Sequence, residues 1–130
     1  MSFSPIGHEL ETVARATVDS AIAVHRELGP GLLESVYEHC LAHELVSRGL
    51  HVGRQVPQPV TYAGERLDAG FRLDLLVENS VIVEVKAVDA LASIHEAQLL
   101  TYLRLSRCRL GLLINFNSIL LKNGIRRLVL

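Results

Sequence analysis

The sequence has few of the residues that build disulfide scaffolds, cysteine-based zinc sites or aromatic binding surfaces. Only two cysteines occur, Cys40 and Cys108, and they lie far apart with no partner spacing. This pattern disfavours a disulfide framework or a zinc site and is typical of a protein of the reducing cytosol, so a cytoplasmic location is expected. Tryptophan is absent and aromatic residues make up only 5% of the chain, which leaves few platforms for stacking on single-stranded nucleic acid.

Long apolar runs and low-complexity segments are missing as well. No stretch approaches the roughly 20 apolar residues of a membrane span, and the N-terminal MSFSPIGHELETVARA is too polar for a signal peptide. We therefore expect no membrane partner. Hydrophobic residues make up 49% of the chain and charged residues 21%, a composition that excludes disorder and predicts a folded protein. At this length we expect a single domain over residues 1–130.

Acidic residues are absent from the last part of the chain. Residues 1–97 hold all fourteen acids against seven bases, whereas residues 98–130 hold no acid and six bases. Such asymmetry is expected of a protein that binds a polyanion on one side, although a solvated basic tail explains it equally well. The six bases are Arg104, Arg107, Arg109, Lys122, Arg126 and Arg127.

Apolar residues recur at steps of three and four in three segments, which predicts helices over residues 8–28, 33–48 and 90–106. The first helix is expected to end at Gly29-Pro30-Gly31, because proline cannot continue a helix and glycine tolerates the reversal.

Between the second and third helices the period changes to two. Residues 51–62 carry two prolines and suit an edge strand, YAGERL contains the residues of a hairpin turn, and residues 71–77 and 81–87 read as central strands. After the third helix, LGLLINF is predicted to be a buried strand and LLKNGIRRLVL a hairpin that turns at Asn123-Gly124. The order α-α-β-β-β-β-α-β with a β tail predicts an α/β fold, a mixed sheet flanked by helices.

Three charged residues lie within the two most apolar predicted strands, at Asp74, Glu84 and Lys86. Glu84 and Lys86 share one face of their strand. Asp74 joins them if a three-residue loop at residues 78–80 pairs Val77 with Val81. Two adjacent carboxylates repel each other, and a divalent cation such as Mg²⁺ removes that penalty. With the lysine beside it, this group has the chemistry of phosphodiester hydrolysis. A plain surface ion pair is the alternative, since Glu-x-Lys alone carries little information.

Together with two further motifs, these residues resemble the PD-(D/E)xK nuclease superfamily. Asp74, Glu84 and Lys86 match its Asp…Glu-x-Lys signature, with Leu73 in place of the preceding proline. GLLESVY, residues 31–37, is similar to the Gly-x-x-Glu-x-x-Tyr motif of a small bacterial family within it, and QLLTY, residues 98–102, to the Gln-x-x-x-Tyr element of RecB-type nucleases. The resemblance covers nearly the whole chain and implies a minimal restriction-endonuclease-like fold.

The resemblance implies a role for each matching residue. Glu34, Asp74 and Glu84 would bind Mg²⁺ or Mn²⁺ together with the carbonyl of Val85, and Lys86 would be the catalytic lysine. Gln98 would support the catalytic site, and Tyr102 would touch substrate. Arg104, which lies among the late bases, is a further candidate for contact with nucleic acid. The implied activity is metal-dependent hydrolysis of a nucleic acid, with DNA as the expected substrate.

Alternatives remain open at this point. The chain could be a nuclease fold without activity that binds nucleic acid or a protein partner. A homodimer is a further expectation, because so small a domain enlarges its contact surface for a substrate by pairing with a copy of itself. His25 is a weaker candidate for the site. His39 and His43 have the spacing of a zinc pair, but no third ligand is evident and an exposed helical face explains them better.

Overall fold

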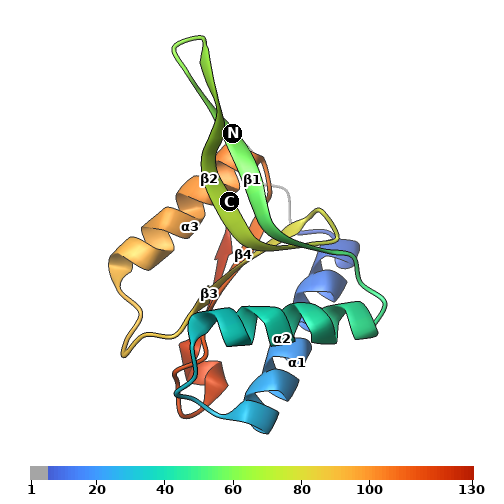
Figure 1. Ribbon diagram of the computed structural model, residues 1–130. Coiled ribbons are helices and arrows are strands. Elements are labelled where there is room, and N and C mark those ends of the chain that lie inside the picture. The colour runs from blue at the N-terminus through green and yellow to red at the C-terminus, as the bar shows by residue number, and fades with distance from the viewer. Residues whose placement is uncertain (1–5) are drawn as a thin grey trace.

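A computed structural model describes residues 6–130 of the chain. Over this range a five-stranded sheet carries two helices on one face and one helix on the other (Figure 1). The elements, in chain order, are α1 (His8–Leu28), α2 (Glu34–Ser47), β1 (Val52–Tyr62), β2 (Glu65–Val77), β3 (Val81–Lys86), α3 (Ser93–Ser106), β4 (Leu110–Asn115), the short 3-10 helix η1 (Leu121–Gly124) and β5 (Ile125–Val129).

The sheet is mixed, as the sequence predicted. Its strand order is β1-β2-β3-β4-β5, with β3 and β4 parallel and every other neighbouring pair antiparallel. Helix α3 makes the crossover between the two parallel strands, which is why the chain can return to the sheet in the same direction. The fold is a restriction-endonuclease-like α/β arrangement in one small domain.

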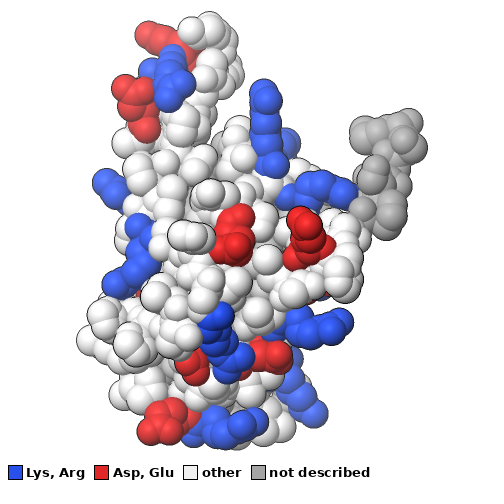
Figure 2. All heavy atoms as spheres, turned by 90° about the vertical axis from the view of Figure 1, so that its right-hand side faces the viewer, with Lys and Arg blue, Asp and Glu red and all other residues white. Residues whose placement is uncertain are grey.

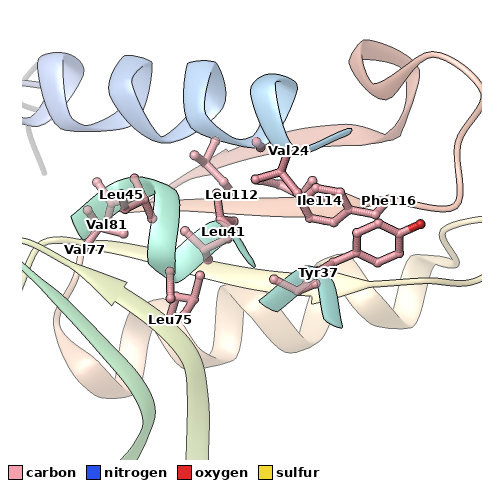
Figure 3. Close-up of a cluster of buried hydrophobic side chains, with 14 of the residues drawn as sticks. Val24, Tyr37, Leu41, Leu45, Leu75, Val77, Val81, Leu112, Ile114 and Phe116 are labelled. Atoms are coloured by element: carbon pink, nitrogen blue, oxygen red, sulfur yellow. The ribbon is translucent and has the colours of Figure 1, made fainter. Parts of the chain in front are cut away.

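Each face of the sheet has its own hydrophobic core. The larger core lies under α1 and α2, where Tyr37, Leu41 and Leu45 pack on Leu75 and Val83 and on their neighbours (Figure 3). The smaller core lies under α3 and joins Leu99 and Leu103 of the helix to sheet residues Leu73, Ile82 and Leu113. Because β3 and β4 lie between the two cores, every residue of β4 is buried and only the last residue of β3 is partly exposed.

The structure corrects two details of the predicted strands. Four strands were expected before the third helix, but β2 runs without a break through residues 65–77, so that β1, β2 and β3 are the three strands there. The Asn123-Gly124 hairpin is also wrong, because these residues end η1, and β5 pairs with β4 instead. Gly124 is there for close packing: a Cβ on it would lie 2.2 Å from Ser118 Oγ and 2.6 Å from the Asn115 carbonyl oxygen.

Strands β1 and β2 extend beyond the body of the molecule as a two-stranded ribbon (Figure 1). The predicted turn at YAGERL is confirmed, since Ala63 and Gly64 have φ angles of 50° and 82°, as a two-residue hairpin turn requires. Residues 65–70 are all exposed, and charges of both signs lie side by side at the outer end of the ribbon in Figure 2. Within residues 6–130, no helix has the length and apolar character needed to cross a bilayer.

Candidate active site

Strand β2 changes face at Asp74. In a regular strand, residues two apart lie on the same face of the sheet, yet Leu75 belongs to the core under α1 and α2 whereas Leu73 belongs to the core under α3. Strand β1, which pairs with β2, changes face at the same place, because Val52 packs on the core under α1 and α2 whereas Val56 packs on the core under α3. Between them Gln55 has a φ angle of 49°, in the left-handed region. The ribbon is therefore twisted locally where its first charged candidate lies.

The strand register brings the two candidate carboxylates together. Strands β2 and β3 pair Leu75 with Val83 and Val77 with Val81, which confirms the three-residue loop. Asp74 and Glu84 are the next residues along this register, just beyond its last pair. Carboxylate oxygen Oδ2 of Asp74 accepts a hydrogen bond of 2.9 Å from the backbone N–H of Val85. Oxygen Oδ1 lies 3.4 Å from the side-chain amide nitrogen of Gln55, which donates to it. Both oxygens of Asp74 are therefore held from neighbouring strands.

Glu84 is a buried acid with one oxygen that no hydrogen-bond donor reaches among the described residues. Its side chain belongs to a residue only 4% exposed, and its Oε1 atom has no hydrogen-bond partner among the described residues. Burial, followed by the adjacent Asp74 carboxylate, raises the pKa of Glu84 to about 9, although the Lys86 ammonium pulls it the other way. Without a cation, Glu84 therefore holds a proton at neutral pH.

Lys86 and Tyr102 complete the surroundings of this acidic pair. Lys86, half-buried at the end of β3, lies near enough to Glu84 to lower its pKa. Tyr102 of α3 stacks on Phe71 of β2 with ring centroids 4.3 Å apart. Burial and the negative charges of Glu84 and Asp74 raise the pKa of the Tyr102 phenol, so the hydroxyl stays protonated at neutral pH.

The other predicted site residues lie further out. Gln98 and Arg104 are exposed on α3, before and after Tyr102. Glu34 is exposed at the first residue of α2. Nothing in the described residues joins these three side chains to the acidic pair, and their predicted roles stay predictions.

Helix α2 reaches the acidic pair through a residue that the sequence did not single out. Glu38 is 8% exposed, and its carboxylate accepts hydrogen bonds from the Gln55 amide at 2.8 Å and the Arg54 guanidinium at 3.1 Å. The same Gln55 amide nitrogen donates to Asp74. Glu38 could have been found, because it lies three residues before Leu41 and seven before Leu45 on the buried side of the helix. Gln55 carries no such signal in the sequence.

Three further candidates have packing roles. Tyr37 is fully buried and stacks on Phe116 at 4.7 Å, while its hydroxyl donates to the Gly29 carbonyl oxygen and accepts from the Leu32 N–H. It therefore fixes the α1–α2 connection. His25 hydrogen-bonds the Ser118 carbonyl oxygen at 2.7 Å. Of the two histidines with zinc-pair spacing, His39 hydrogen-bonds Arg54, and no cluster of three or more metal-ligating side chains forms within residues 6–130.

The acidic pair itself fits a divalent cation. Mg²⁺ and Mn²⁺ bind through one or two protein carboxylates, and waters or substrate oxygens complete the shell. Asp74 and Glu84 supply these two carboxylates, and Oε1 of Glu84 has no hydrogen-bond partner within residues 6–130. A cation there would replace the proton on Glu84 and compensate the charges of both carboxylates.

Comparison with known proteins agrees with this geometry. A family model described as the PD-(D/E)XK nuclease superfamily matches residues 11–128. The chain belongs to the PD-(D/E)XK nuclease superfamily. No curated protein and no solved structure gives a significant match. The narrower Gly-x-x-Glu-x-x-Tyr family remains a resemblance carried by residues 31–37.

Proposed function

We propose that the protein is a nuclease that hydrolyses the phosphodiester bonds of DNA with the help of Mg²⁺ or Mn²⁺. The observation that carries the proposal is the buried Glu84, with an oxygen that has no partner among residues 6–130, beside Asp74 and Lys86 on adjacent strands. Surface ion pairs do not bury a carboxylate without a partner, because the desolvation penalty would exceed the gain. Membership of a nuclease superfamily supports the same activity.

Each residue of the group has a role in this proposal. Asp74 and Glu84, with the carbonyl of Val85, would hold the cation, and Glu34 would reach it through water. A bound cation supplies charge stabilisation at the phosphate and lowers the pKa of a water molecule. Lys86 would place its ammonium beside the reacting phosphate, where negative charge builds up in the transition state. Tyr102 would donate a hydrogen bond from its hydroxyl to a substrate oxygen, and Gln98, one turn before it, would orient the same region.

The test is cleavage of labelled single- and double-stranded DNA and RNA in Mg²⁺, Mn²⁺ or EDTA. Wild-type protein should cleave DNA in either metal and not in EDTA. Replacing Lys86 with alanine should lower the rate about a hundredfold or more, because one electrostatic group at the reacting centre is lost. Lys122→Ala is the matched control, since Lys122 is the only other lysine and is exposed on η1.

Two outcomes would contradict the proposal. Cleavage by Lys86→Ala at the wild-type rate would point to a contaminant or to another site. Binding of nucleic acid with no cleavage of any substrate would show that the fold serves as a binding module. The homodimer stays part of the proposal, and sedimentation of the same samples with and without DNA tests it.

A further inference from the structure

We infer that Gln55 and Glu38 form a clamp that positions Asp74 for metal binding, so that helix α2 controls the cation site through Glu38. This inference rests on the proposed function and adds two positioning residues to it. The clamp is the chain of contacts Glu38–Gln55–Asp74, which crosses from α2 through β1 to β2.

The first step is the geometry of the Gln55 amide. Its nitrogen lies 2.8 Å from Glu38 Oε1 and 3.4 Å from Asp74 Oδ1, so its two hydrogens are directed to two different carboxylates. The other Asp74 oxygen accepts the Val85 N–H at 2.9 Å. Asp74 is therefore held at both oxygens, and outside the acidic pair itself the Gln55 contact is the one that comes from a side chain among the hydrogen bonds of the described residues.

The second step is the backbone of Gln55. A non-glycine residue in the left-handed region is uncommon and costs free energy, and such residues persist where surrounding contacts hold them. Gln55 has a φ of 49° within β1, away from the hairpin turn. The unusual conformation coincides with the change of face at Asp74, so it sets the direction of the Gln55 side chain and of the carboxylate it meets.

The third step is the anchoring of the clamp. Glu38 is 8% exposed on the packed side of α2, next to the buried Tyr37. Its second oxygen, Oε2, accepts from Arg54 at 3.1 Å. A buried carboxylate that receives two donors is fixed in direction, and it fixes the amide that donates to it. Outer hydrogen-bond partners of this type orient the groups that bind a metal.

The experiment measures Mn²⁺ affinity by calorimetry, and cleavage, in Gln55→Gly and Glu38→Ala. Glycine accepts the left-handed backbone without strain, so Gln55→Gly should keep the fold, although Glu38 loses one donor. It should nevertheless bind Mn²⁺ about 10- to 100-fold more weakly, the usual effect of losing such an outer partner. Glu38→Ala should weaken Mn²⁺ binding in the same way, and Glu38→Gln should restore most of it, because a glutamine carbonyl can still accept from Gln55.

Arg54→Ala tests how far the anchoring of Glu38 matters. It removes one of the two donors to Glu38 but leaves the Gln55 contacts, so Mn²⁺ affinity should fall less than in Glu38→Ala, and the free energy of unfolding should fall slightly. If Gln55→Gly fails to fold, Gln55→Asn serves, since asparagine tolerates the left-handed region but is one methylene too short for both contacts. Wild-type Mn²⁺ affinity in the Gln55 variants would overturn the clamp alone. Absence of Mn²⁺ binding by the wild type would overturn the proposed function and the clamp with it.

Discussion

At the scale of single residues, Glu84 is an acidic side chain buried within the apolar strand β3. The residue has two buried neighbours in sequence, Val83 and Val85, and one of its oxygens finds no donor in the part of the chain that the structure describes. The sequence identified Asp74, Glu84 and Lys86 because charges in such strands are rare, and their register followed from one loop length. Gln55 could not be predicted, since its importance arises from a backbone angle that no local pattern encodes.

The raised pKa of Glu84 has a measurable effect on stability. Between the ordinary pKa of 4.5 and the folded value of about 9, the folded protein keeps a proton that the unfolded chain has lost. Stability from this group is therefore complete below pH 4.5 and falls as pH rises, by at most about 1.4 kcal/mol per pH unit. We expect urea denaturation to show this fall in metal-free wild type and to show a flatter profile in Glu84→Gln. Saturating Mg²⁺ should also flatten the wild-type profile, and identical profiles for both proteins would contradict the assignment.

At the scale of elements, α2 illustrates which parts of the fold the sequence could and could not define. Its bounds were predicted to within a residue, and the predicted apolar positions Tyr37, Leu41 and Leu45 are buried, because apolar periodicity reports on burial. The first predicted position, Leu33, is 73% exposed, because it lies before the helix begins. Its contribution to the site was assigned to Glu34, from the motif, whereas the structure places Glu38 in contact with the cluster through Gln55. The Gly-x-x-Glu-x-x-Tyr motif indicates where helix α2 begins. Which of the two acids one turn apart, Glu34 or Glu38, faces the sheet depends on the angle at which the helix packs.

The entry to α2 depends on the Tyr37 hydroxyl. Tyr37→Phe keeps the ring stacked on Phe116 but leaves the Gly29 carbonyl and the Leu32 N–H without their partner. We expect the free energy of unfolding to fall by about 1–2 kcal/mol, the cost of unpaired groups at a partly buried position. Chemical denaturation measures this. Tyr62→Phe is the control, because Tyr62 is 79% exposed at the tip of the ribbon and should change nothing. Equal effects of the two substitutions would mean that the hydroxyl is not structural.

At the scale of the whole molecule, the six late bases do not act as one group. Arg127 forms an ion pair with Glu11, which ties β5 to α1. Its neighbour Arg126 lies opposite Leu113 in the β4–β5 register, and Leu113 belongs to the core under α3. Arg126 therefore lies on the α3 side of the sheet, where Arg104 and Arg107 are also exposed. The late basic residues are therefore divided between the two faces of the sheet. Those suited to bind a polyanion lie on the face covered by α3.

Adjacent arginines make this difference testable. Arg126→Ala should weaken DNA binding and reduce the slope of log affinity against log salt by about 1, the effect of losing one phosphate contact. Arg127→Ala should leave the slope unchanged and lower thermal stability instead, because its guanidinium is engaged by Glu11. Fluorescence anisotropy over a salt series measures the slope. A larger change in slope for Arg127→Ala would place the nucleic acid on the opposite face.

The two edges of the sheet differ in what they offer another polypeptide. Strand β1 forms one edge and carries Pro57 and Pro59, which have no N–H to donate. A foreign strand laid along β1 would find gaps in its ladder, so this long exposed edge resists templated aggregation. Strand β5, at the other edge, contains no proline. If two copies of the chain join their sheets edge to edge, β5 is the strand whose backbone can continue the hydrogen-bond ladder.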